Sequence, residues 1–201
     1  MTRVHRSRLP LMAVCVAAAL PASAADWKAN EAVKTYAISG TTGSELYASI
    51  GGKGPLLSGG VRVIAHTTFD LKWSRKYEPQ ADGSCRLVSA KPFLTITYTL
   101  PKPSQKLSSA TAARWAAFID GMTAHEKVHG QHIRELVDEI LAVTVGFSFA
   151  NDPGCKKIRE AIKTPLAAAS QRQRERSRDF DKVEMSSGGN VHRLVLALVN
   201  G

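Results

Sequence analysis

Residues 125–130 read His-Glu-Lys-Val-His-Gly, inside a long stretch whose apolar residues recur at helical spacing. A helix turns about 100° per residue, so His125 and His129 project from one face, a single turn apart. Two imidazole nitrogens placed in this way can reach one metal ion. Glu126 lies at the edge of the same face, where its carboxylate can contact a water on the metal without binding the metal itself. This HExxH pattern predicts a zinc site, with His125 and His129 as ligands and Glu126 as the general base.

The residues around the motif support a helix with one buried face. Steps of three and four connect the histidines to an apolar series on both sides: Trp115, Phe118, Met122, Ile133, Leu136, Ile140 and Val143. Ser108 or Ser109 is the expected N-cap, the helix is expected to end near Thr144, and Gly130 is the candidate position for a bend. Histidines on a buried face need polar partners, and a shared metal supplies one. Core histidines with other partners, or a solvated helix face, are the alternatives.

The N-terminal half has a strand pattern. Strict alternation predicts a long strand with one buried face, made by Val61, Val63, Ala65, Thr67, Phe69, Leu71 and Trp73. His66 then falls on the more solvated side. Two further strands are expected at 85–89 and at 93–100, the second beginning after Pro92 and ending before Pro101. Thr42 and Glu45 have capping-box spacing for a short helix over 44–50, and glycines at 51–60 mark turns.

The C-terminal part is expected to be helical. A turn at 151–154 precedes a second helix over about 155–179, interrupted near Pro165, and the glycines at 188 and 189 end it. The apolar tail at 192–199 is either a final strand or a disordered end. The predicted fold class is α+β, with an antiparallel sheet in the N-terminal half packed against two main C-terminal helices. We expect a single domain over 25–201, with the order of 186–201 left open.

The first 24 residues have the features of an export signal. They contain three arginines, an apolar run over 9–20 and the small-residue cleavage site Ala22-Ser23-Ala24. The apolar run is too short for a membrane span, and no later stretch is long enough to cross a bilayer. We therefore expect a periplasmic or secreted protein with no membrane span after signal cleavage.

Two cysteines, Cys85 and Cys155, remain once the signal with Cys15 is removed. In an exported chain they most simply form one disulfide. The bond closes a loop of about 70 residues, which the chain-entropy model rates at roughly 4 kcal/mol. The alternative, that they bind zinc, is weaker because neither has a second cysteine at ligand spacing.

The chain is basic, with a net charge of +10 that becomes +7 when the three signal arginines are removed with no acid. Such a charge favours anionic partners, so a cell-envelope polymer is a candidate partner beside a peptide or protein substrate. Arginines alternate with other residues in the late run Arg172, Arg174, Arg176 and Arg178. Aromatic residues do not interleave with them as in a nucleic-acid surface, so we expect no nucleic-acid partner and interpret the run as a solvated helix face.

The order of these features resembles a known family. The chain resembles domain-of-unknown-function family 922 in a series of short segments. They are Tyr36-Ala-Ile-Ser-Gly-Thr41, Glu45-Leu46, Gly54-Pro55, Ala65-His-Thr67 with Trp73, Trp115-Ala-Ala-Phe118 before the HExxH motif, and the separated cysteines. That family consists of secreted bacterial proteins described as predicted zinc-dependent proteases. The resemblance covers about residues 34–181 and implies a zincin-like fold and peptide hydrolysis. It departs near the end, where Phe180-Asp181 stands in place of a Tyr-Asp pair and 184–187 replaces a Thr-x-His-Gly segment.

A catalytic zinc usually has three protein ligands and a water. The resemblance implies Asp181 as the third ligand, and Glu175 from the second helix is the alternative. His132 is seven residues from His125, about 10.5 Å along a helix, which is too far for a shared ion. Asp138 and Glu139 are candidates for orienting a ligand imidazole, although exposed helix charges are their default interpretation.

The function expected from these features is an exported zinc-dependent metallopeptidase that uses Glu126 and a zinc-activated water. The alternatives are a non-catalytic envelope-binding module that keeps the fold, and a zinc amidase that acts on peptidoglycan.

Overall fold

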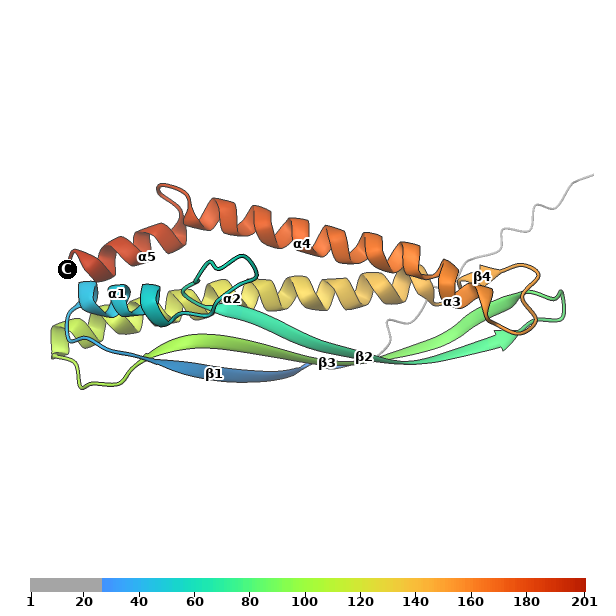
Figure 1. The fold of residues 1–201 in the computed structure, drawn as a ribbon, viewed down its shortest axis with the longest axis horizontal. Coiled ribbons are helices and arrows are strands. Elements are labelled where there is room, and N and C mark those ends of the chain that lie inside the picture. Colours follow the sequence, from blue (N-terminus) through green and yellow to red (C-terminus); the bar gives the residue numbers. More distant parts are fainter. Residues whose placement is uncertain (1–26) are drawn as a thin grey trace, which may run out of the picture.

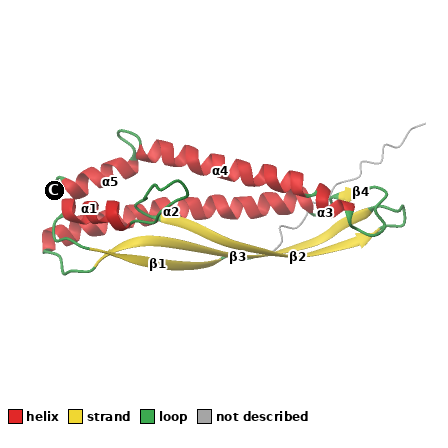
Figure 2. Cartoon of the chain, viewed as in Figure 1, coloured by secondary structure: helices red, strands yellow, loops and turns green. Residues whose placement is uncertain are grey.

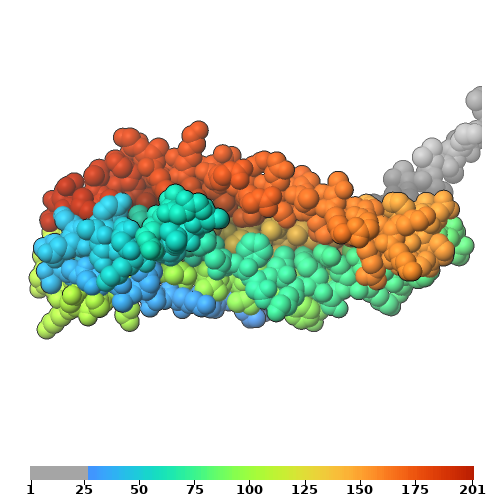
Figure 3. Space-filling model, viewed as in Figure 1, coloured from blue at the N-terminus to red at the C-terminus, as the bar shows by residue number. Residues whose placement is uncertain are grey.

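The computed structural model describes residues 27–201, in which a long sheet runs beside two layers of helices (Figure 1; Figure 2). The predicted export signal, residues 1–24, lies outside the described residues. The fold class is α+β, as predicted, and the molecule is elongated along the direction of its longest helix and strands (Figure 3). Within residues 27–201, the helices lack the combined length and apolar character needed to cross a bilayer.

The sheet is mixed rather than antiparallel. It contains β1 (Asn30–Ile38), β2 (His66–Pro79) and β3 (Cys85–Pro103) in the order β1-β3-β2, and the short β4 (Ser148–Phe149) pairs with the start of β3. β2 and β3 are antiparallel, as predicted, but β1 and β3 are parallel. The antiparallel prediction fails for β1 because β3 turns back from β2 into the place beside β1 and runs in the same direction.

β3 is one continuous strand, although the sequence predicts two strands separated by Pro92. Pro92 pairs with Trp73 of β2 but lies before the β1 pairing, which begins at Thr95. Pro101 and Pro103 pair with β1 but lie beyond the β2 pairing, which ends at Thr99. Each proline therefore has a neighbouring strand on one side only, where a missing N–H can be tolerated.

β2 begins at His66, five residues later than the alternation predicts. Residues 54–65 form a loop that turns at Gly59 and Gly60, both with positive φ. Val61, at the expected start of the strand, is 62% exposed. From Ala65 onward the alternation is followed except at Phe69, which is 43% exposed, because the segment pairs with β3 from His66 and that partner fixes one face inward.

The first two helices begin where the sequence predicts. α1 (Gly43–Lys53) starts with the complete capping box of Thr42 and Glu45. α2 (Ser109–Thr144) is capped by Ser108 and is assigned as one helix through Gly130, where the sequence suggested a bend. A Cβ at Gly130 would lie 2.2 Å from Tyr98 Oη. The glycine therefore allows α2 to approach β3 closely.

The C-terminal helices differ from the prediction in their bounds. α3 (Lys157–Ala161) and α4 (Lys163–Met185) are separated at Ile162, close to the predicted interruption, and α4 continues six residues beyond the expected end at 179. The tail is neither a strand nor disordered, but α5 (Asn190–Val199). Its apolar residues follow helical spacing and pack against α1 and α2: Val191, Leu194, Val195 and Leu198.

The helices form two layers over the sheet (Figure 1). α2 packs on β3 and β2, and α4 packs mainly on α2 rather than directly on the sheet. The prediction of two main helices is therefore confirmed, but only one of them covers the sheet broadly. This order of layers places α2 between the sheet and α4, so that the HExxH segment can contact both.

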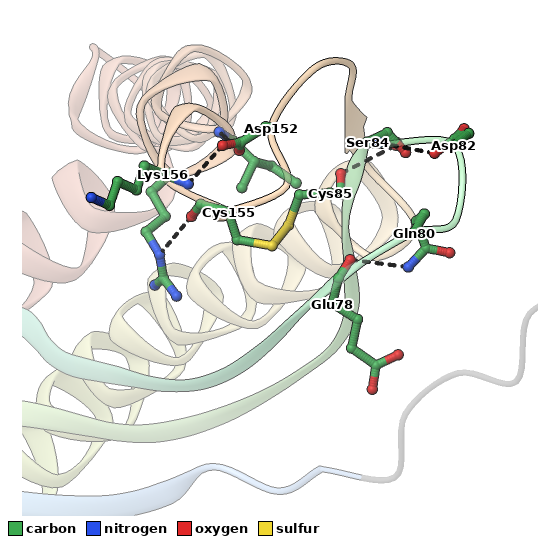
Figure 4. The surroundings of a disulfide bond; sticks show 11 residues. Glu78, Gln80, Asp82, Ser84, Cys85, Asp152, Cys155 and Lys156 are labelled. Carbon is green, nitrogen blue, oxygen red and sulfur yellow. Dashed lines mark hydrogen bonds between the residues drawn. A yellow bond between two sulfur atoms is a disulfide. The ribbon is translucent and has the colours of Figure 1, made fainter.

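A disulfide joins Cys85, at the start of β3, to Cys155, just before α3 (Figure 4). Asp152 supports the same turn, since its carboxylate accepts hydrogen bonds from the backbone N–H groups of Lys156 and Ile158, both at 2.9 Å. The predicted pairing is confirmed, and it ties the β-rich half to the C-terminal helices at one end of the molecule.

Candidate metal centre

His125 and His129 of α2 meet Asp181 of α4 at one point. His125 Nε2 lies 3.2 Å from His129 Nε2, and Asp181 Oδ1 lies 3.1 Å from the first nitrogen and 2.9 Å from the second. His125 is 4% exposed. The structure therefore brings together the three residues named as metal ligands from the sequence, and they form a group able to hold a metal ion.

The size of this triangle suits zinc. Zinc binds imidazole nitrogen and carboxylate oxygen at about 2.0–2.2 Å with tetrahedral geometry, which separates the ligand atoms by about 3.3 Å. The observed separations of 2.9–3.2 Å are close to that value. One carboxylate and two imidazoles are also a donor set that occurs in catalytic zinc sites.

The short distances between these side chains shift the pKa of Asp181 and the pKa of His129. Burial raises the pKa of Asp181, but hydrogen bonds and positive charge from His125 and His129 outweigh it and leave that pKa below its ordinary value. Burial lowers the pKa of His129, but the hydrogen bond and negative charge of Asp181 outweigh it and raise the value. The centre therefore favours a positive charge between these side chains, whether a proton or a metal cation supplies it.

Glu126 is buried beside the centre but is not part of the triangle. Thr67 of β2 directs its hydroxyl to Glu126 Oε2, at 2.5 Å, with the Glu126 carbonyl oxygen 3.2 Å away. The glutamate is only 4% exposed, and it lines the same cavity as the two histidines. β2 thus fixes the position of this carboxylate at the wall of the cavity.

Phe180 and Glu184 of α4 complete the surroundings of His125. The Phe180 ring stacks on the His125 imidazole at 4.8 Å and meets the His129 ring edge-on at 5.5 Å. Glu184 Oε2 lies 3.7 Å from His125 Nδ1, a buried nitrogen that has no hydrogen-bond partner in residues 27–201. A ligand histidine commonly donates its second N–H to a carboxylate, and Glu184 is placed for that role.

Sequence reasoning gives Phe180, Glu184 and Thr67 no role at the centre. The helical spacing of Phe180, Asp181 and Glu184 would indicate that they share one face, but only if the helix is predicted to continue past 179. Thr67 gives no such signal, because its contact with Glu126 joins segments 59 residues apart.

The other residues considered as ligands or as orienting groups lie away from the point where His125, His129 and Asp181 meet. The Glu175 carboxylate accepts a hydrogen bond from Gln171 at 2.9 Å and does not join the centre. His132 Nδ1 is 3.2 Å from Ser177 Oγ, consistent with exclusion from the shared ion. Asp138 binds Trp27 and Glu139 binds Arg172, so the expectation that they orient a ligand imidazole is wrong. Both point to the flanks of α2 because they lie off the face of the histidines.

A cavity of about 310 Å³ opens over the centre. β2 contributes His66 and Phe69, the 54–65 loop contributes Leu57 and Val63, and α4 contributes Met185. His66 is half-buried and lines the cavity, whereas the alternation placed it on the more solvated side. The 54–65 loop and α4 lie beside His66 in the cavity wall, so they partly cover a side chain that the sheet alone would leave in solvent.

The family model described as "Bacterial protein of unknown function (DUF922)" matches residues 33–189, and the chain belongs to this family. The matched range includes both histidines, Glu126, Asp181 and both cysteines of the disulfide. No curated protein and no solved structure matches the chain.

Proposed function

We propose that this member of the DUF922 family is an exported zinc-dependent metallopeptidase of the zincin type. The observation that carries the proposal is the meeting of His125, His129 and Asp181 within 3.2 Å, beside the buried carboxylate of Glu126. Two of these side chains come from α2 and one from α4, and a packed core holds both helices. The predicted export signal and the Cys85–Cys155 disulfide support a periplasmic or secreted location.

His125, His129 and Asp181 would hold the zinc through Nε2, Nε2 and Oδ1. When bound, zinc supplies a Lewis acid that polarises a peptide carbonyl and makes water more acidic. Glu126 Oε2 takes a proton from the attacking water and later delivers it to the leaving amine. The Thr67 hydroxyl keeps the carboxylate aimed at the cavity while it does so. His66, on the cavity wall, offers a polar group to a substrate bound there.

The test compares the zinc content and the casein or peptide cleavage of the mature chain with those of two variants. Glu126→Gln should keep zinc and lose cleavage by roughly 10²–10⁴-fold, because it removes a general base. His125→Ala should lose the zinc itself. Glu135→Gln, which changes another glutamate of α2 that lines no part of the cavity, is the matched control and should behave as the native chain.

Each other outcome has a defined meaning. Undiminished turnover by Glu126→Gln excludes its role as the base. Bound zinc without chelator-sensitive cleavage makes the chain a non-catalytic binding module. Release of peptidoglycan fragments, in place of peptide cleavage, makes it an amidase that acts on an envelope polymer.

A further inference from the structure

A second hollow, of about 600 Å³, adjoins the metal cavity. The two share Leu57, His66, Gln173, Ser177 and Asp181 in their walls. The second hollow adds Arg174 and Arg178 of α4, two exposed side chains. Among the described residues that line it, Asp181 is the only acid, and the proposed function assigns it to the metal. A substrate lying over the centre therefore meets two guanidinium groups on one side.

The arginine run of α4 is divided between two flanks of the helix. Arg172 pairs with Glu139 of α2, and Arg176 lies 3.8–3.9 Å from Glu135 and Glu139. Arg174 and Arg178 fall on the other flank, where the spacing of four and then three residues brings them into line with Asp181. The run is thus only in part the solvated face that the sequence predicts, because one half of it ties α4 to α2.

Arg174 and Arg178 form no ion pair and donate no hydrogen bond within residues 27–201. Two like charges one turn apart are mildly destabilising to a helix. Their guanidinium groups present rigid forks of donors that match a carboxylate. An anionic group in the hollow would both relieve the repulsion and satisfy those donors.

The metal cavity itself also has apolar walls. Phe69 is 43% exposed and Met185 is 48% exposed, and both line it together with Leu57 and Val63. Apolar side chains therefore have a place beside the centre, while negative charge has its place on the arginine side.

We infer that the cleft selects peptides with an acidic side chain close to the scissile bond, bound by Arg174 and Arg178. This inference rests on the proposed function for the position of that bond. Arg178 is three residues from Asp181 and Arg174 is seven, or about 4.5 and 10.5 Å along the helix. An extended peptide advances about 3.3 Å per residue, so the acidic side chain belongs within about three residues of the bond.

The experiment measures binding separately from cleavage. A dansyl-labelled peptide of alanine and leucine with a central glutamate, and the same peptide with glutamine, are titrated into zinc-loaded and zinc-free Glu126→Gln by fluorescence anisotropy. The glutamate peptide should bind more tightly, and the double change Arg174→Gln with Arg178→Gln should remove that preference, a loss of roughly tenfold or more. Cleavage by the chain with Glu126 intact should show the same preference in kcat/KM.

Lys34→Gln with Lys102→Gln is the matched control. It removes the same two positive charges from exposed positions on β1 and β3 that line neither hollow, and the preference should persist. Equal binding of the two peptides, or a preference that survives the arginine changes, overturns the inference. Tighter arginine-dependent binding of a sheared anionic envelope glycan also overturns it in favour of a polymer. Failure of the proposed function appears differently, as absence of zinc or of cleavage from the chain with Glu126 intact.

Discussion

The metal centre and the disulfide end both join segments far apart in the sequence, but they do so in different ways. At the disulfide end the joint is covalent, and the Asp152 carboxylate is fully engaged by backbone N–H groups. At the centre, three polar atoms crowd within 3.2 Å, and the buried His125 Nδ1 has no hydrogen-bond partner in residues 27–201. At the disulfide end, the covalent bond and the hydrogen bonds of Asp152 hold the two segments together without a ligand. The metal centre gathers a carboxylate and two imidazoles around one point, an arrangement that a positive charge would stabilise.

This contrast implies that the two regions can be altered independently. The disulfide constrains the unfolded chain whether or not a ligand is present, whereas stabilisation of the fold by a bound ligand rises with the logarithm of ligand concentration.

The largest effect is expected at the covalent joint. Replacing Cys85 and Cys155 together by serine should lower the free energy of unfolding by roughly 4 kcal/mol, because a loop of about 70 residues is no longer closed in the unfolded chain. Urea denaturation measures this loss. Zinc affinity, measured by titration calorimetry on the same variant, should be unchanged. A parallel loss of zinc binding would show that the two regions are coupled.

The metal should stabilise the centre by a smaller amount. Zinc at about a hundred times its Kd should raise the free energy of unfolding by about 2.7 kcal/mol, since it binds the folded chain. Asp181→Asn should abolish this gain, while Asp179→Asn, an exposed neighbour on α4, should retain it. Thermal melts with and without zinc provide the measurement. Equal zinc responses in the two variants would exclude Asp181 as a ligand.

Loss of the contact between Glu184 and His125 should weaken zinc binding without abolishing it. Glu184→Gln should weaken zinc binding by about 10–100-fold, because the ligand imidazole loses the carboxylate that orients it. Competition with a chromophoric chelator measures the affinity. Glu175→Gln, whose carboxylate binds only Gln171, is the matched control. If both changes leave the affinity as it was, the 3.7 Å approach of Glu184 is packing alone.

The smallest effect concerns a charged cluster on the sheet side of α2 that needs no ion. Glu31 of β1 pairs with Lys127 and Arg134 and accepts a hydrogen bond from Tyr98 at 2.8 Å. The hydrogen bond from Lys127, with those from Arg134 and Tyr98, outweighs burial and lowers the pKa of Glu31 from 4.5 to about 2. A lowered pKa means that the carboxylate stabilises the fold above pH 4.5 and loses this effect as the pH falls towards about 2.

Glu31→Gln should therefore lower the free energy of unfolding by at most about 1 kcal/mol near neutral pH, since the pair is partly exposed. The difference from the native chain should shrink on acidification, as followed by denaturation at a series of pH values. A difference that grows towards low pH would contradict the assignment. Zinc affinity should not change, which would separate this satisfied cluster from the metal centre.

Much of the local structure could be predicted from the sequence. The capping box of Thr42 and Glu45, the cap at Ser108 and the alternation after Ala65 all depend on neighbours within a few residues. The alternation predicts a strand from Val61, but a strand also needs a partner, and β3 offers none before His66. For the tail the sequence predicts a strand or a disordered end, although Val191, Leu194 and Leu198 have the spacing of a helix.

The site divides in the same way. His125, Glu126 and His129 could be placed together from their spacing alone, because one turn of a helix sets where three of its side chains point. The residues from other elements could not. The family resemblance, not spacing, implies Asp181 rather than Glu175. The approach of Asp181 to the histidines, the contact of Thr67 with Glu126 and the two flanks of the arginine run depend on how α4 and β2 pack against α2. Backbone geometry fixes the relative positions of side chains within one helix or strand. Which face of a helix or strand packs against another element is decided by burial of the whole core.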